Sequence, residues 1–567
     1  MKRPPHKPAR APQATADPRA LEALGLSRRA EGRLEDAVAA YQESIRLDPA
    51  AFGPRFNLGN AFHAMARFDE AVASYRRALA ADAGQAGGWN NLGDALWHLE
   101  QTQDALSAYR AAVLLQPEVA EFQFNLGRAA FECEAWAESE RALTTAITLR
   151  PDFGVAYLFL GRVHEQTQAW QPAAEHYATA VRLLPGDPVA RNCLIPMLQR
   201  FSRLDEAVVL AREVLALLPD SAAAHANLAS LLLDAGALAE AEVLLRRALD
   251  LDATMRGIRY TLSMVLLTGG RWREGFTAYD GRWSSMGFPR PVPPPYWDGT
   301  PAPGKTILVH AEQGFGDQIQ FCRFLPRAAA RCARLLVQAT APMRRLLESI
   351  DAPFTLYEGT LAEAPPGSWD LACGMGDLPS LLEMPDDVPP NAPYLRADPE
   401  AVTAWRARLA PLPGRTVGLA WAGNPDQPMD HLRSLPFAAL APLAGVAGVS
   451  FVSLQLGGAD WTRPPPGQQP DLQLSDWTDE LGDFADTAAL IVALDLVITV
   501  DTAVAHLAGA LGKPVWLLNR SETDWRWMRD RSDSIWYPSM RIFRQPSPGQ
   551  WEPVIAAVTA ALVSGSV

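Results

Sequence analysis

The chain has 567 residues, of which 48% are hydrophobic and 20% are charged, and its formal net charge is −13. This composition excludes a disordered or fibrous protein and provides for about three to five domains of roughly 100–200 residues each. The acidic balance argues against a nucleic-acid-binding protein, which normally carries a basic face. No apolar run reaches the roughly 18–20 residues that a helical membrane span needs, so no membrane span is expected.

The beginning of the chain and its cysteines bear on where the protein works. Residues 1–19 are rich in Lys, Arg and Pro and contain no apolar segment of the kind found in a secretory signal. We expect them to form a disordered basic tail. The 5 cysteines are dispersed without a Cys-x-x-Cys pair. This usage favours a cytoplasmic protein with reduced thiols over a disulfide framework or a zinc site.

A period of 34 residues follows the tail. The repeated positions are Pro49, Pro117, Pro151, Pro185 and Pro219 and the Leu-Gly pairs that start at Leu58, Leu92, Leu126 and Leu160. Within one period, apolar residues at a spacing of three to four predict two amphipathic helices, for example over 55–65 and 69–80. Because a single helix pair cannot bury both of its faces, the pairs must stack into a solenoid.

This pattern resembles the tetratricopeptide repeat, with about eight helix pairs over residues 20–283. The sixth unit departs from the family, because Cys193-Leu194-Ile195 stand in the place of the Leu-Gly pattern. We expect that unit to be intact but locally distorted.

Asparagine recurs directly before the repeated leucine, although Asn is a mediocre helix former. The positions are Asn57, Asn91, Asn125 and Asn227. One interpretation is a cap or a hydrogen bond between repeats. The other is a ladder of amides that grips the backbone of an extended peptide. The ladder resembles the superhelix of the O-linked N-acetylglucosamine transferases, which implies that the solenoid binds an acceptor polypeptide.

The pattern changes at residues 284–303, where prolines cluster and predict a stiff linker. Short apolar strands then alternate with helices such as 318–330. The expected strands are 306–310, 335–338, 354–357 and 370–373, followed by 416–421, 449–455, 496–500 and 514–518. They predict two doubly wound domains, residues 304–400 and 401–567, that face one another across a cleft. Ligands of such sheets bind beyond the carboxyl ends of the strands.

The first turn at such a strand end carries Asp317. The stretch Glu312-Gln313-Gly314-Phe315-Gly316-Asp317 is neither a dinucleotide fingerprint nor a phosphate loop with a lysine. It offers a carboxylate at the start of a helix that faces the cleft. The alternative is that Asp317 only caps this helix, a role worth about 1 kcal/mol.

Two further turns contain candidate anion-binding groups. After the strand 416–421, Asn424, Arg433 and Ser434 could bind a phosphate or simply hold the loop. Gln455, at the end of the strand 449–455, joins the same group of candidates.

After the strand 496–500, Asp501-Thr502-Ala503 lead into a helix expected over 506–511. Backbone N–H groups and the helix dipole favour an anion there. His506 could donate to a phosphate oxygen or could be a packing residue.

The segment 484–518, with Asp501-Thr502-Ala503-x-x-His506 and Gly512-Lys513-Pro514, is similar to the carboxyl-terminal core of the heptosyltransferases, glycosyltransferase family 9. Gly316-Asp317 matches the amino-terminal signature of that family, so the resemblance covers about residues 304–560. It implies a GT-B module of two facing Rossmann-like domains after the all-α solenoid.

The resemblance also implies an activity. The second domain would bind most of the nucleotide-sugar donor, which is a substrate, so no cofactor is expected. Transfer would be inverting and independent of metal, and no Asp-x-Asp pair lies at a suitable strand end. Asp317 would be the catalytic base. The donor-binding residues would be Asn424, Arg433, Ser434, Gln455, Asp501, Thr502, Ala503 and His506. Ala503 stands where the family usually has Gly, a small change that keeps the backbone site.

The combination of repeats with this module resembles the bacterial tetratricopeptide glycosyltransferases that modify proteins such as flagellin. It predicts transfer of a sugar to Ser/Thr hydroxyls of a protein acceptor, such as flagellin, that the solenoid recruits. Two alternatives remain: a transferase that acts on a glycan or a lipid-linked acceptor, and a non-catalytic adaptor with a degenerate transferase domain.

Overall fold

A computed structural model of the chain describes residues 17–285, 290–312, 314–357, 361, 367–384, 393–424, 430–456 and 472–565. Its contacts divide the chain into two compact units, Met1–Leu217 and Leu218–Val567, and each is described by itself. The predicted basic tail lies outside the described residues up to position 16.

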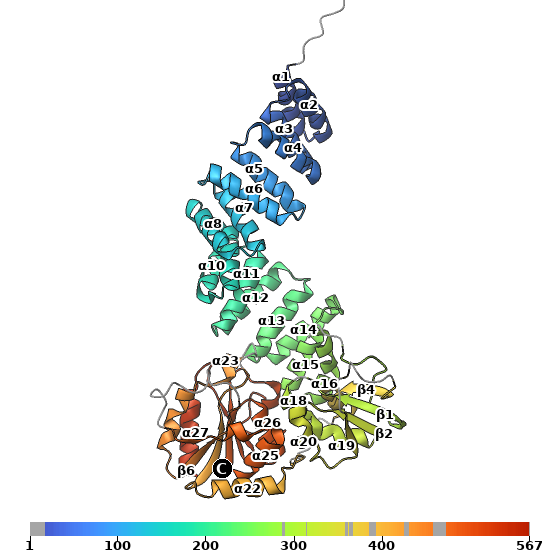
Figure 1. The fold of residues 1–567 in the computed structure, drawn as a ribbon, viewed down its shortest axis with the longest axis vertical. Helices are drawn as coiled ribbons and strands as arrows, with labels where there is room; N and C mark the ends of the chain where they lie inside the picture. Colours follow the sequence, from blue (N-terminus) through green and yellow to red (C-terminus); the bar gives the residue numbers. More distant parts are fainter. Residues whose placement is uncertain are drawn as a thin grey trace, which may run out of the picture. The chain divides into compact units, whose positions relative to one another are not determined.

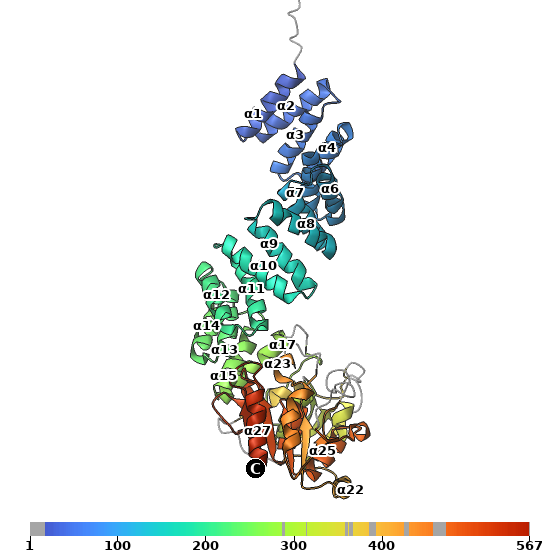
Figure 2. The same cartoon turned by 90° about the vertical axis from the view of Figure 1, so that its left-hand side faces the viewer.

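The first unit is a succession of antiparallel helix pairs, which confirms the two-helix repeat (Figures 1 and 2). The pairs are α1 (Pro18–Ala30) and α2 (Leu34–Leu47), α3 (Phe52–Ala64) and α4 (Phe68–Ala81), α5 (Ala86–His98) and α6 (Thr102–Leu115), α7 (Ala120–Glu132) and α8 (Trp136–Leu149), α9 (Gly154–Gln166) and α10 (Trp170–Leu183), and α11 (Pro188–Arg200) and α12 (Leu204–Leu217).

The repeated glycine and the repeated tyrosine pack against each other within a pair. A Cβ atom added to Gly59 would lie 2.6 Å from the ring of Tyr75, and one added to Gly93 would lie 2.6 Å from Tyr109. Both tyrosine rings are buried. The glycine is therefore required because the aromatic ring of the second helix occupies the space that a side chain on the first would need.

In the sixth pair these two sizes are exchanged. Ile195 stands at the glycine position of α11, Ala211 stands at the tyrosine position of α12, and both are buried. A large residue on the first helix and a small one on the second keep the total volume similar, which packed cores tolerate. The pair is intact as expected, and Pro196 lies within α11.

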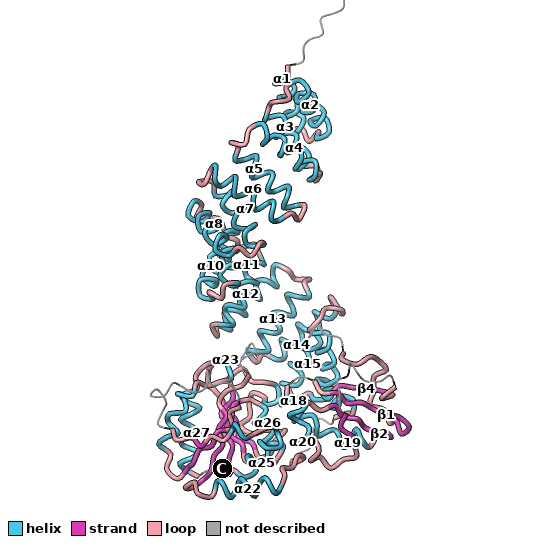
Figure 3. Tube along the Cα trace, viewed as in Figure 1, coloured by secondary structure: helices cyan, strands magenta, loops and turns pink. Residues whose placement is uncertain are grey.

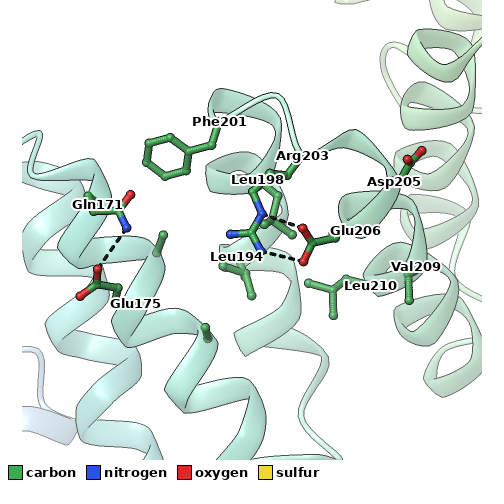
Figure 4. A pocket seen from close by; sticks show the side chains of 12 residues that line it. Gln171, Glu175, Leu194, Leu198, Phe201, Arg203, Asp205, Glu206, Val209 and Leu210 are labelled. Carbon is green, nitrogen blue, oxygen red and sulfur yellow. Dashed lines mark hydrogen bonds and ion pairs between the residues drawn. The ribbon is translucent and has the colours of Figure 1, made fainter. Parts of the chain in front are cut away.

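An open groove with a volume of about 440 Å³ lies beside this pair (Figure 4). Leu194, Leu198 and Leu210 supply apolar lining from α11 and α12. An ion pair between Arg203 and Glu206, with 2.7 Å between Nε and Oε1, lies at the groove.

The second unit begins with helices that continue the repeat pattern. They are α13 (Ala222–Ala235), α14 (Leu238–Leu251), α15 (Ile258–Thr268), α16 (Trp272–Ala278), the 3-10 turn η1 (Tyr279–Gly281) and α17 (Arg282–Ser285).

A four-stranded parallel sheet follows, in the order β3-β2-β1-β4. Figure 3 labels β4, β1 and β2 of this sheet. Its strands are β1 (Ala302–His310), β2 (Cys332–Gln338), β3 (Phe354–Tyr357) and β4 (Leu371–Gly374). Its helical segments are α18 (Phe315–Phe321), η2 (Cys322–Phe324), α19 (Leu325–Ala329), η3 (Ala341–Met343), α20 (Arg344–Leu347), η5 (Met375–Asp377) and α21 (Leu378–Leu381). The single helix predicted over 318–330 is broken in three, and Pro326, which lacks an N–H donor, lies in the first turn of its last piece, α19.

The second sheet has six parallel strands in the order β10-β9-β8-β5-β6-β7. They are β5 (Arg415–Ala420), β6 (Val449–Ser453), β7 (Leu474–Ser475), β8 (Leu496–Val500), β9 (Val515–Asn519) and β10 (Met540–Arg544). The helical segments are α22 (Pro399–Leu409), α23 (Asp430–Arg433), η6 (Phe437–Gly445), η7 (Thr478–Glu480), α25 (Phe484–Ala493), α26 (Ala503–Ala510), η8 (Trp525–Trp527) and α27 (Glu552–Ser564). Strands β7 and β10 were not predicted.

One hydrophobic core joins the last repeat to both sheets. Trp272 and Phe276 of α16 lie in the same buried cluster as Val309 of the first sheet and Leu517 of the second. The proline-rich segment also packs on the first sheet, since the N–H of its buried Trp297 donates to the carbonyl of a β4 residue at 2.9 Å. The last helices of the repeat therefore share the interior of the α/β region.

Candidate active site

Each sheet has a topological switch point, where the strand order reverses and the chain continues on the other side of the first strand. In the first sheet this point lies between β1 and β4, and in the second between β5 and β8. The carboxyl ends of these strands are the usual ligand-binding position in parallel α/β sheets. The turns predicted to carry function, after β1, β5 and β8, all lie at these two points.

The point between β1 and β4 is filled by Arg282, from the first position of α17. Its guanidinium donates to both carboxylate oxygens of Glu312, at 2.8 and 2.7 Å, and to Oδ1 of Asp377 at 2.6 Å. The Arg282 side chain is 1% exposed. The end of the repeats is thereby anchored where an open α/β sheet would otherwise receive a ligand.

Burial and charge compete at these two carboxylates. Burial raises the pKa of Glu312 even though Arg282 opposes the rise. Burial would also raise the pKa of Asp377, but the attraction of Arg282 and Arg290 outweighs it and leaves this pKa below its usual value. Sequence reasoning missed Arg282, because nothing in the repeat pattern marks one arginine as a partner for residues after β1 and β4.

Asp317 lies in the first turn of α18, as expected, and both of its oxygens have partners. Gly314 is the N-cap, and its N–H donates to Oδ2 of Asp317 at 3.1 Å. Oδ1 accepts from Nη2 of Arg526. Burial raises the pKa of Asp317, and the nearby Arg526 opposes that rise. Gly314, not Asp317, is therefore the N-cap, and Asp317 supports that cap from the third helical position. Asp317 is also paired with the distant cation Arg526, which a capping role would not require.

Arg526 comes from η8, after β9, and contacts residues from both sheets. Its Nε donates to Oε1 of Gln320 on α18 at 2.5 Å, and its Nη1 donates to Oδ1 of Asp524 at 2.9 Å. The guanidinium also lies 4.2 Å from the ring centroid of Trp525. Arg526 was not among the predicted residues, and an arginine in a loop after an ordinary strand gives no signal in a single sequence.

Helix α26 begins at Ala503, three residues earlier than predicted, because Thr502 takes the extended N-cap conformation. His506 is buried and its Nδ1 lies 2.9 Å from the hydroxyl of Tyr537. Burial holds the pKa of His506 well below its usual value, so the ring is neutral at physiological pH. A Cβ atom added to Gly316 would lie 2.8 Å from this ring, so the turn before Asp317 and helix α26 are in close contact.

Asp501 and Thr502 lie at the carboxyl end of β8. Burial raises the pKa of Asp501, and the nearby Asp524 raises it further. The hydroxyl of Thr502 lies 3.2 Å from that of Thr499. Nη1 of Arg433 donates to the backbone carbonyl of Asp501 at 3.2 Å. The turns after β5 and β8 are therefore joined at the strand ends.

Around Arg433 the polar side chains hold the loop in place. Asp430 accepts from Nε of Arg433 at 2.8 Å and from the hydroxyl of Ser434 at 2.7 Å. Oε1 of Gln455 accepts from two backbone N–H groups directly after β5, at 2.9 and 3.0 Å. Asn424 is exposed. The second interpretation of this turn, that it holds the loop, has direct contacts, and Asp430 is a member that sequence reasoning missed.

The asparagines of the repeats make hydrogen bonds to the preceding repeat. The Nδ2 donors of Asn57, Asn91 and Asn125 bond to Glu22, Asn60 and Asn90, each at 2.9 Å. Asn227 is half-buried on α13 in the second unit. In the first unit these contacts are the hydrogen bonds between repeats that one of the two interpretations predicts. A bound peptide would have to use the amide oxygens of these asparagines or replace their present hydrogen-bond partners.

Within the described ranges, no group of three or more His, Cys, Asp or Glu side chains is placed to hold a metal ion. The 5 cysteines are all free. Among the helices of the described residues, none has both the length and the apolar character needed to cross a membrane.

Family models match segments of both the repeat region and the α/β region. Tetratricopeptide-repeat families match residues 25–65, 56–113, 90–139, 134–188 and 200–260. Glycosyltransferase family 9 (heptosyltransferase) matches residues 482–528, which include Asp501, His506 and Arg526. The chain thus combines tetratricopeptide repeats with a segment that matches glycosyltransferase family 9. The predicted resemblance is thus confirmed, although the family match covers a shorter segment than 304–560.

Individual proteins are similar over part of this fusion. Protein FlbA of Caulobacter vibrioides is 32% identical over 330 residues, which cover 54% of each chain. The chain thus spans about half the length of this curated relative. A solved structure of Pseudomonas aeruginosa pilF is 21% identical with a TM-score of 0.32 and covers 36% of this chain and 92% of its own. A tetratricopeptide repeat protein from Parabacteroides merdae is 15% identical with a TM-score of 0.33, covering 44% and 98%.

Proposed function

We propose that this protein transfers a sugar from a nucleotide-sugar donor to Ser/Thr hydroxyls of a protein acceptor that the repeats recruit, with flagellin as one candidate acceptor. The two parallel sheets would act as the facing domains of a GT-B module. Residues 304–400 would serve the acceptor side and residues 401–567 the donor side. Transfer would be inverting and would need no metal.

The observation that carries this proposal is the position of Asp317. A partly buried carboxylate lies on α18 of the first sheet, and the neighbouring Gly316 lies against His506 of α26 on the second. A hydroxyl that attacks an anomeric carbon must lose a proton, and a positioned carboxylate that accepts it contributes roughly 10²–10⁴-fold to the rate. Asp317 is the proposed base.

The donor would bind at the ends of β5 and β8. As its bond to the sugar breaks, the nucleotide diphosphate gains negative charge, which the amino terminus of α26 and Arg433 would stabilise. Because His506 is neutral, its contribution would be a hydrogen bond or packing and not a charge. Ser434 and Gln455 would act by holding the loop after β5, to which both are hydrogen-bonded.

The test of Asp317 is its change to Asn. The Asn side chain keeps one oxygen, which can still accept from the N–H of Gly314, but it loses the second acceptor oxygen and cannot take up the proton. We therefore expect transfer to fall by at least about 10²-fold while donor affinity stays within about twofold. Asp398→Asn is the matched control, because Asp398 is an exposed carboxylate that caps α22 away from the site. Transfer by Asp317→Asn near the wild-type rate would mean that the base lies elsewhere.

The acceptor site needs two variants to separate recognition from repeat packing. Changing Asn57, Asn91 and Asn125 together to Ala removes the amides and their bonds to the preceding repeat. The control changes the bonding partners instead, and these are Glu22, Asn60 and Asn90. If the amides bind the acceptor, only the first variant should lose affinity for the acceptor. Three lost contacts of about 1 kcal/mol each would weaken this affinity by about 100-fold. Equal losses in both would assign the ladder to packing.

A further inference from the structure

We infer that Arg526 is a positioning residue for Asp317: it keeps the Asp317 carboxylate ionised and oriented until that carboxylate accepts the proton of the acceptor hydroxyl. This inference rests on the proposed function and extends it to a residue that neither the sequence motifs nor the family signature singles out.

The guanidinium of Arg526 is held on three sides. Nη2 donates to Asp317, Nε donates to Gln320 and Nη1 donates to Asp524. Two of these partners lie on α18 of the first sheet, and the third lies in the loop after β9 of the second. The Arg526 side chain is 10% exposed. Because guanidinium donors are fixed in one plane, this arrangement determines the direction in which Oδ1 of Asp317 points.

The electrostatic surroundings of Asp317 make the cation necessary. Burial favours the neutral carboxylic acid, and Arg526 is the largest of the influences that favour the charged form, with the N–H of Gly314 adding to it. Asp524 acts in the opposite sense. Among the residues that the structure describes, the buried phenols of Tyr260 and Tyr279 from the repeat helices also act on Asp317, and neither carries a positive charge. His506, beside Gly316, is neutral.

A carboxyl group that is already protonated cannot accept a proton. The ion pair between Arg526 and Asp317 therefore sets the pH range in which Asp317 can act as a base. In the transfer step the acceptor oxygen bonds to the anomeric carbon, and the bond from that carbon to the phosphate oxygen breaks with its electron pair on the nucleotide. The hydroxyl proton passes to Asp317. The neutral acid that results is a weaker partner for Arg526, whose charge Asp524 then continues to balance.

The test is the pH profile of kcat/KM for Arg526→Gln and Arg526→Lys with a nucleotide-sugar donor and the acceptor. Losing an adjacent cation raises a carboxyl pKa by about 1–3, so the acid limb of Arg526→Gln should move up by about one to three pH units. Relative to the wild type, its activity should fall on the acid side of the profile and recover toward alkaline pH. Arg526→Lys keeps the charge but not the planar fork, so its limb should stay in place while kcat falls.

Arg345→Gln is the matched control. Arg345 also joins helices of the two sheets, through Asp483 and Asp486 at 3.1 and 2.9 Å, but it has no contact with α18 among its described ion pairs. Its profile should keep the wild-type acid limb. An unmoved limb in Arg526→Gln, or the same shift in Arg345→Gln, would overturn the inference.

A second readout does not depend on activity. In Arg526→Gln, the pKa of Asp317 in the folded protein lies above its unfolded value by more than in the wild type. The loss of melting temperature should therefore be greatest above that pKa and should shrink as the pH falls through it. Adding Asp317→Asn should restore melting temperature and remove the pH dependence. Losses that simply add would refute the pairing. Wild-type activity of Asp317→Asn would instead refute the proposed function and leave this stability test intact.

Discussion

Replacing Arg282 with Met should destabilise the second unit and leave the first unit unaffected. In the wild type one buried guanidinium compensates two buried carboxylates, Glu312 and Asp377, whose side chains are 7% and 8% exposed. Methionine fills similar space but leaves both charges without their main partner. Breaking a buried ion pair in this way costs about 3–5 kcal/mol.

This loss can be converted to a melting temperature. For Leu218–Val567, an unfolding entropy of about 2.1 cal/mol/K per residue gives about 0.7 kcal/mol/K in total. A destabilisation of about 3–5 kcal/mol therefore lowers the Tm of this unit by about 4–7 °C. The loss should be smaller at pH 5 than at pH 8, because without Arg282 both carboxylates have folded-state pKa values above their unfolded ones and are protonated as the pH falls.

Differential scanning calorimetry would measure these changes. Arg531→Met is the matched control, since Arg531 pairs with Asp533 at the surface and such pairs contribute less than about 1 kcal/mol. Neutralising the partners by Glu312→Gln and Asp377→Asn in the Arg282→Met background should restore much of the loss. A Tm for Arg282→Met within about 1 °C of the control would refute the reasoning that this cluster anchors the last repeat.

Two further outcomes follow from the packing. A chain that comprises residues 218–567 should be soluble and should melt cooperatively when followed by circular dichroism. A chain that comprises residues 284–567 should aggregate, because this truncation removes Trp272 and its neighbours from the shared core. Cooperative melting of the shorter chain would contradict this expectation. Gly93→Ala should lower the stability of the first unit by about 1–3 kcal/mol in a urea titration, since its Cβ would meet the ring of Tyr109, and Tyr109→Leu in the same chain should relieve part of the loss. Additive losses would argue against a direct clash.

The period of 34 residues determined the helix pairs of the first unit, because each unit buries its face only against sequence neighbours. The sequence also determined most of the strands. For example, β3 and β8 have the predicted bounds, because they are short apolar runs between turn residues. The turn that contains Asp317 and the start of α26 could also be predicted, since capping and strand-end chemistry is local.

The tertiary structure alone decided which side chains share the site. Arg526 is 209 residues from Asp317, and Arg282 is 95 residues from Asp377, so no local pattern relates the members of either pair. In parallel sheets, crossover connections bring the carboxyl ends of distant strands to one edge, and the topology selects which loops meet there. The sequence therefore determined the carboxylate that is proposed to act as a base, and the fold decided which cation controls its charge.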